Sequence, residues 1–288
     1  MTTAALKIFW SLRIIDQLNK LLVAEMATNK NYTEDAANAA SVNIFTPGDV
    51  PVKTYTRNTD LPAADIPTDT QTILLLDQQK AIDFFMDKID ITQCPVNVQQ
   101  AYFNRAIYAI RDAIDQFVIG QYINVAIANI WTPAAAVTSA TVWDAFANAD
   151  RLLTDAKVPL ESRFAIIDAW TKMLINSSLQ GKASPLGDQV SANGYVGSFC
   201  GFNCLLSHNV PSTDENLAGT SSTETVSNIL IGHPDGITLA KQIPLDGVGS
   251  LSMFEPEKRF GTEVKGLTVY GAKMCYSGNA NGLIKVWR

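Results

Sequence analysis

The sequence predicts an α+β fold, and three observations lead to that class. A long helical run occupies the first half, several glycine-punctuated strands follow from about residue 193 to residue 275, and a polar stretch separates two strand-like runs near the start. With 288 residues, of which 47% are hydrophobic, the chain can bury a sizeable core. No reactive side chain recurs among the later strands, which points away from catalysis and towards a structural role.

The first predicted element is a helix over residues 4–27. Its apolar residues recur at spacings of three and four and form one stripe, which needs a partner surface: Ile8, Leu12, Ile15, Leu18 and Leu22. Charged residues interrupt the segment Leu6 to Met26, so it lacks the roughly 18 apolar residues of a membrane span. It also lacks the pattern of a signal peptide, and we expect no membrane partner.

Residues 42–56 and 73–86 are predicted strands, with a turn signal at Pro47-Gly48. The polar residues 57–72, which include Pro62 and Pro67, join the two strands as a long tip. An isolated two-stranded ribbon is only marginally stable in water, and loops of this length are uncommon inside compact domains. We therefore expect a projecting arm that lies on a neighbouring subunit.

Residues 96–130 give the clearest helix. Pro95 suits its first turn and Pro133 ends it, and about thirty residues would span roughly 45 Å. Its apolar residues are spaced by three and four: Phe103, Ile107, Ile110, Ile114 and Phe117.

The remaining residues alternate between the two kinds of element. The predicted helices are 142–155, 169–179 and 234–242, the predicted strands are 163–168, 195–206, 264–274 and 283–287, and residues 213–225 form a Ser/Thr-rich surface loop.

The composition is poor in charge. Charged residues make up 17% of the chain, whereas about 25% is usual. Either the surface is rich in Ala, Thr, Asn and Ser, or other subunits cover much of it. The net charge is −6 and no basic cluster occurs, which disfavours direct binding of nucleic acid, because phosphate contacts need positive charge.

The cysteines are Cys94, Cys200, Cys204 and Cys275, and we interpret them as reduced core residues. Cys200, Cys204 and His208 resemble a metal-ligand spacing. In a strand, however, residues four apart lie about 13 Å apart, too far to share one ion. The alternation instead places Cys200, Phe202, Cys204 and Leu206 on one core-facing side.

Other polar candidates also favour structural roles. His233, between Gly232 and Pro234, is expected to make a local hydrogen bond rather than act as a base. The three aspartates Asp83, Asp87 and Asp90 are spaced like one helix face and form a solvated or subunit-facing edge rather than a cation site.

Two short stretches resemble functional motifs only in part. In residues 197–201 the serine stands one place early for a Gly-x-Ser-x-Gly elbow. The mixed-charge run 255–259 is either a solvent-exposed loop or part of a subunit interface.

We expect no catalytic, cofactor-binding or metal-binding residue. An alternative of a different class, a hydrolase or metal-dependent enzyme, would need a convergent polar cluster.

Four stretches of the chain, taken in order, resemble the major capsid proteins of tailed phages. They are 42–44 with 52–56, 76–80 leading to 87–90, 193–211, and 260–273, the last containing Val264-Lys265-Gly266-Leu267. The resemblance implies the Hong Kong 97-like capsid fold, which encapsulin shells also use.

The resemblance also implies a division of the chain into domains. Residues 1–41 would be an N-terminal arm and 42–90 an extended loop hairpin. Residues 91–134 and 256–288 would form a peripheral domain with a spine helix, and 135–255 an axial domain.

A capsid protein of this kind would self-assemble as hexamers and pentamers into an icosahedral head shell around double-stranded DNA. Its possible partners are a separate scaffolding protein, a portal and decoration proteins. We expect it in the virion capsid after assembly in the host cytoplasm. The alternative within the same fold is an encapsulin-type compartment. Some relatives cross-link lysine to asparagine between subunits, but no motif assigns such a bond to Lys53, Lys80 or Asn279.

Overall fold

The computed structural model describes most of the chain. The described residues are 19–20, 22–48, 50–60, 63–93, 98–133, 135–180, 197–216, 223–243, 251–276 and 279–287. Most of the predicted helix 4–27 lies outside them. Its described end forms only a short 3-10 helix, η1 (Ala24–Ala27). A second one, η2 (Asp35–Asn38), follows.

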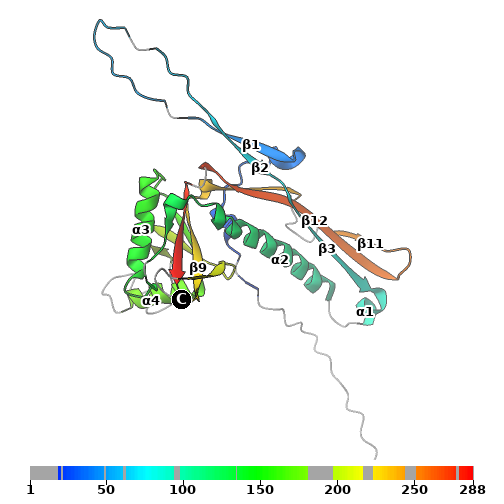
Figure 1. The fold of residues 1–288 in the computed structure, drawn as a ribbon. Helices are drawn as coiled ribbons and strands as arrows, with labels where there is room; N and C mark the ends of the chain where they lie inside the picture. Colours follow the sequence, from blue (N-terminus) through cyan, green and yellow to red (C-terminus); the bar gives the residue numbers. More distant parts are fainter. Residues whose placement is uncertain are drawn as a thin grey trace, which may run out of the picture.

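An elongated half is built on β12 (Gly261–Met274), the centre of a four-stranded sheet. β10 (Ile237–Ile243) and β11 (Ser252–Phe254) pair with one edge of β12, and β3 (Gln78–Asp87) pairs with the other. The helix α2 (Val98–Ile119) lies along this sheet, and α1 (Lys88–Gln93) lies at its far end (Figure 1). The two layers bury one shared apolar core, whose members include Phe103, Ile107, Ile110 and Ile114 from α2 and Met86, Val264 and Tyr270 from the sheet.

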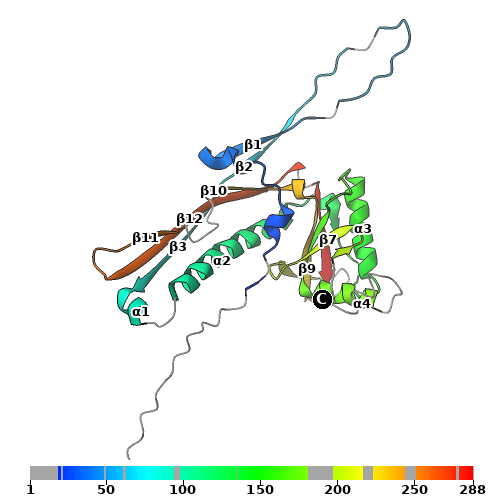
Figure 2. The ribbon, with the colours of Figure 1, turned by 180° about the vertical axis from the view of Figure 1, so that it is seen from behind.

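A compact half contains a seven-stranded sheet. Its central strand is β9 (Thr223–Gly232), flanked by β13 (Asn281–Trp287) on one side and by β5 (Phe164–Ile167) and β8 (Ser212–Asn216) on the other. The outer strands are β4 (Ile130–Trp131), β7 (Phe202–Leu206) and β6 (Ser198–Phe199). The helices α3 (Val142–Asp155) and α4 (Ala169–Leu179) pack against it (Figure 2).

A buried arginine fixes the connection between α3 and β5. The Arg163 side chain is 1% exposed. Its guanidinium donates to the carbonyl oxygens of Pro159 and Val158 at 2.8 and 2.6 Å, and to the Asp150 carboxylate. A buried guanidinium is tolerated only with such partners, so these contacts hold the residues between α3 and β5 against α3.

The projecting hairpin consists of β1 (Ser41–Thr46) and β2 (Thr70–Leu75), which pair antiparallel from Ser41 opposite Leu75 to Thr46 opposite Thr70. The extended loop, residues 47–69, continues beyond this pair and stands clear of both halves (Figure 1). The hairpin with a long polar tip is therefore confirmed. Within it, the predicted strand at 50–56 and the turn at Pro47-Gly48 are wrong, because 50–56 has no strand partner among the described residues. The predicted strand 73–86 is two strands, separated at Leu76 and Asp77.

The predicted helix 96–130 is too long. α2 ends at Ile119, which gives about 33 Å at 1.5 Å per residue. The chain then continues in two 3-10 helices, η3 (Gly120–Asn124) and η4 (Ile127–Asn129). Gly120 and the β-branched residues that follow favour the α-helix less than the preceding alanine-rich turns do.

Three other predictions need correction. Residues 195–206 contain a hairpin rather than one strand, because Cys200 and Gly201 have φ values of +52° and +82° and form a tight turn. Residues 234–242 are a 3-10 turn, η5 (Pro234–Gly236), followed by β10, since Ile237 to Ala240 are buried in the sheet rather than on a helix face. The expected surface loop 213–225 includes the paired strands β8 and β9.

The helices predicted at 142–155 and 169–179 are confirmed, as are the strands around 164–167, 264–274 and 283–287. No helix among the described residues is long and apolar enough to cross a membrane.

Candidate assembly surfaces

The extended loop exposes apolar side chains on both of its limbs. Val52 in the first limb is 98% exposed and Ile66 in the second is 89% exposed. The tip turns at Thr56 to Thr59, where the Thr59 amide donates to the Thr56 carbonyl at 3.1 Å and Asn58 has a φ of +63°. The limbs are tied by side chains rather than by a ladder, because Lys53 Nζ lies 2.9 Å from the Asp65 carboxylate and also donates to the Ala63 carbonyl.

The base of this loop is held at one close crossing. A Cβ atom placed on Gly271 of β12 would lie 2.0 Å from the carbonyl oxygen of Leu75 in β2. Only glycine allows the two backbones to approach this closely. A small apolar cluster below the crossing includes Ala36, Val42, Ile44, Leu74, Leu76, Ala240 and Cys275. The hairpin is therefore anchored at its base and unsupported at its tip.

An N-terminal segment, residues 19–20 and 22–29, runs along α2 and is held by one buried carboxylate. Asp115 is 2% exposed, and its Oδ1 accepts from the backbone amides of Val23 and Ala24, both at 2.8 Å. Its Oδ2 accepts from Asn209 Nδ2 at 2.9 Å. Because Asn209 follows β7 of the compact half, Asp115 joins three parts of the molecule.

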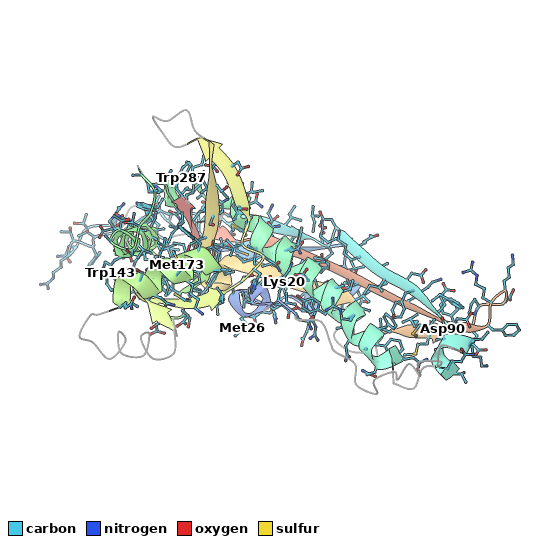
Figure 3. All side chains as sticks on the ribbon, turned by 90° about the horizontal axis from the view of Figure 1, so that it is seen from below. Lys20, Met26, Asp90, Trp143, Met173 and Trp287 are labelled. Atoms are coloured by element: carbon cyan, nitrogen blue, oxygen red, sulfur yellow. The ribbon has the colours of Figure 1, made fainter. Side chains whose placement is uncertain are left out.

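Further polar contacts line the same segment. Lys20 Nζ donates to Asn209 Oδ1 at 3.1 Å and lies 3.5 Å from the Asp112 carboxylate. At the other end, Asn29 exchanges backbone hydrogen bonds with β10. Figure 3 shows Lys20 and Met26 where the two halves meet.

Glu25 completes the attachment of this segment. It pairs with Lys241 at 2.5 Å and with Lys30 at 3.1 Å. Burial raises the pKa of Glu25, but the hydrogen bonds and charges of Lys241 and Lys30 outweigh this and leave the pKa below its ordinary value.

The far end of the elongated half exposes aromatic and charged residues. Phe260 is 85% exposed. Arg259 lies over the Phe85 ring at 5.9 Å, and Lys265 lies over the Phe254 ring at 4.7 Å. Asp90, on α1, lies at this end in Figure 3.

The helices of the compact half carry a second exposed apolar group. Trp143 on α3 and Trp170 and Met173 on α4 are each roughly 40–45% exposed. Figure 3 shows Trp143 and Met173 at the end of the molecule opposite Asp90. Exposed apolar side chains therefore occur at both ends and on the extended loop.

No protein-family model and no curated protein matches this chain. Solved structures do match over nearly its whole length. A structure from Mycobacterium phage Che8 has a TM-score of 0.80 and 23% identity, covering 97% of this chain and 96% of that chain. The capsid of Cyanophage P-SCSP1u has a TM-score of 0.73 and 16% identity, over 98% and 92%. The capsid of Ralstonia phage GP4 has a TM-score of 0.72 and 11% identity, over 100% and 98%.

This chain has the fold of tailed-phage capsid proteins. The fold expected from the sequence resemblance is thereby confirmed at full length.

Within this capsid fold, the cysteines and His208 are spread apart. Cys200 lies in the turn before β7, Cys204 lies within β7, and His208 is exposed beyond it. Burial raises the pKa of Cys204 to about 12, so its thiol stays protonated at neutral pH and is a poor nucleophile or metal ligand. Cys94 lies outside the described residues. In the part of the chain that the structure describes, no three His, Cys, Asp or Glu side chains gather closely enough to hold a metal ion.

The predicted local role of His233 is confirmed, because its Nδ1 accepts from the Asp235 amide at 3.2 Å at the start of η5. The three aspartates do not share a helix face: Asp83 and Asp87 belong to β3 and only Asp90 belongs to α1. Asp87 instead accepts from the Ile89 amide at 2.8 Å at the start of α1.

Sequence reasoning missed Asp115 and Asn209. The available signal was an aspartate within the apolar stripe of α2, directly after Ile114, where a charge cannot be buried without partners. Nothing in the sequence indicated that its partners would be the amides of residues 23 and 24.

Proposed function

We propose that this chain is a major capsid protein, which self-assembles into an icosahedral head shell that encloses double-stranded phage DNA. The observation that carries the proposal is the extended loop, whose apolar residues find no cover within the described chain. The full-length similarity to phage capsid structures supports the same conclusion. The chain would do no chemistry, and its place would be the capsid of the virion after assembly in the host cytoplasm.

In this proposal, residues 1–41 serve as the N-terminal arm and 42–90 as the extended loop hairpin. The elongated half corresponds to the peripheral domain with α2 as its spine, and the compact half to the axial domain. Two strands refine the division: β10 belongs with the peripheral domain because it pairs with β12, and β13 belongs with the axial domain because it pairs with β9.

Assembly would be driven by the burial of exposed apolar surface between subunits. The extended loop and the exposed ends of both halves gain apolar and backbone contacts only on a neighbouring copy, so association stabilises them by mass action. Head-to-tail contacts of this kind close into rings, here hexamers and pentamers. A scaffolding protein, a portal and decoration proteins are the further partners, and the DNA is enclosed without sequence-specific binding.

The test is negative-stain electron microscopy of the purified chain, run beside size-exclusion chromatography. Uniform shells or capsomer rings are the expected result. A chain that stays monomeric at high concentration, with crowding agent and with the other structural proteins of its virion, would overturn the proposal.

A further inference from the structure

The strand β3 has an open edge. Within the described part of the chain it pairs with β12 alone, over the ten positions from Gln78 to Asp87. One face of β3 is covered, because Ile82, Phe84 and Met86 pack into the core beneath α2. Its backbone groups on the side away from β12 have no strand partner among the described residues. A long unpaired edge is a template for pairing with another chain.

The first limb of the extended loop, residues 50–56, complements the open edge of β3, because it has the sequence of a strand but no strand partner among the described residues. Its sequence, Val-Pro-Val-Lys-Thr-Tyr-Thr, is rich in β-branched and aromatic residues, which favour strands. It is extended in the structure, yet it pairs with no described strand, and its side chains are largely exposed. A sequence that favours a strand but has no ladder among the described residues of its own chain points to a ladder with a second chain.

The position of Pro51 restricts how this limb can pair. Proline has no N–H to donate, so it is found in edge strands with its nitrogen facing away from the ladder. Because neighbouring residues of a strand point their backbone groups to opposite sides, Val52, Thr54 and Thr56 would then bond to the partner strand. Lys53 and Tyr55 would face away from it. The limb can therefore hydrogen-bond to a partner strand along only one of its two edges, as the outermost strand of a sheet does.

Charge favours the first limb over the second. Residues 50–58 carry Lys53 and Arg57 and no acidic residue, whereas residues 77–87 carry three aspartates and one lysine. The second limb, residues 63–69, carries Asp65, Asp69 and Pro67, so its charge has the same sign as β3 and it has fewer strand-favouring residues.

The loop is also long enough. From Pro47 to Asn58 it contains twelve residues, which extend to about 40 Å at 3.3 Å per residue. The limb of seven residues, about 23 Å in extended form, fits along the ten residues of β3.

We infer that residues 50–56 of one subunit add to the open edge of β3 in a second copy of this chain, as a fifth strand of the elongated sheet. The inference rests on the proposed function, since the second copy is the neighbouring subunit of the shell. The main-chain hydrogen bonds supply the affinity, and the positive charge of Arg57, opposite in sign to the aspartates of β3, favours this limb over the other.

Hydrogen exchange read by mass spectrometry at single-residue resolution tests the pairing, with free subunits compared to assembled shells. In shells, the amides of Val52, Thr54 and Thr56 should exchange at least tenfold more slowly, while those of Lys53 and Tyr55 change less. The amides of β3 that face away from β12 should slow in parallel.

Two adjacent substitutions provide a matched pair. Thr54→Pro removes a donor that bonds to β3, whereas Tyr55→Pro removes one that faces away. Thr54→Pro should raise the concentration needed for assembly about tenfold, and Tyr55→Pro should raise it much less, although it removes the larger side chain.

Each result has a distinct meaning. Shells in which the limb exchanges as fast as in free subunits, or in which the limb slows and β3 does not, would overturn the strand pairing and leave the capsid function intact. Equal effects of the two proline substitutions would do the same. A wild-type chain that forms neither shells nor rings would overturn both proposals.

Discussion

The compact half and the extended loop differ in whether their side chains find contacts among the described residues. In the compact half, two buried charged groups find partners within the chain: Arg163 is surrounded by acceptors, and Asp168 accepts from the Thr171 amide and the Ser227 hydroxyl at 2.9 and 2.8 Å. In the extended loop, Val52 and Ile66 face solvent. The difference teaches that these charged groups of the compact half are paired within the chain, while the apolar side chains of the loop have no cover among the described residues.

The largest loss of stability is expected from removing the buried contacts of Arg163 in the compact half. Replacing Arg163 with methionine leaves the carbonyls of Val158 and Pro159 and the Asp150 carboxylate without their donor, so unfolding should become easier by about 3–5 kcal/mol. Urea denaturation measures this. The control Arg151→Met removes only an exposed pair with Asp155 on the same helix and should cost less than about 0.5 kcal/mol. Equal losses in the two variants would show that the burial of Arg163 does not matter.

A smaller loss is expected where the N-terminal segment joins the two halves. Asp115→Ala removes the acceptor of two backbone amides and should cost about 3 kcal/mol, whereas Asp112→Ala, whose carboxylate is partly exposed, should cost about 1 kcal/mol. Trypsin cleavage after Lys30 should become faster in Asp115→Ala while cleavage after Arg57 in the extended loop stays unchanged. Unchanged cleavage after Lys30 would show that Asp115 does not hold the segment.

The base of the hairpin offers a substitution that should weaken both folding and assembly. Gly271→Ala forces β2 away from β12, because the new Cβ would meet the Leu75 carbonyl, and should cost about 1–3 kcal/mol. The redirected loop should also reduce the yield of shells. Gly120→Ala serves as control, since no atom lies within 4 Å of the added Cβ. Full shell yield from Gly271→Ala would contradict the importance of this crossing.

The smallest effect is expected from acid. The folded-state pKa of Glu25 lies below its unfolded value of about 4.3, so its pairing with Lys241 and Lys30 contributes stability above that pH. That contribution is lost as the pH falls through the folded pKa. The fall in urea midpoint between pH 6 and pH 3 should be smaller in Glu25→Gln than in the wild type. Identical pH dependence in both proteins would rule out this contribution.

Local sequence patterns predicted the helices of the compact half but missed β9, the central strand of its sheet. The helices at 142–155 and 169–179 follow their apolar spacing, because each packs one face on a sheet of the same half. Residues 234–242 were predicted as helix although 237–242 belong to β10, since pairing with β12, whose partner residues lie 26 to 37 positions further on, decides their conformation.

The same limit applies to the candidate surfaces. The polar tip predicted a projecting loop, and the structure confirms it. The strand predicted at 50–56 has no strand partner in the part of the chain that the structure describes, which is the expected failure if its partner lies on another copy. The Asp115 and Asn209 contacts could not be found, because they join residues more than ninety positions apart.

The most direct test of the difference between the two regions removes the extended loop. Thr46 and Thr70 are paired, so an Asn-Gly turn can replace residues 47–69 and close the hairpin. The shortened chain should keep the unfolding free energy of the wild type to within about 1 kcal/mol, because few contacts are lost, yet electron microscopy should show neither shells nor rings. Normal shells from the shortened chain, or a shortened chain that fails to fold, would contradict the assignment of the loop to a neighbouring copy.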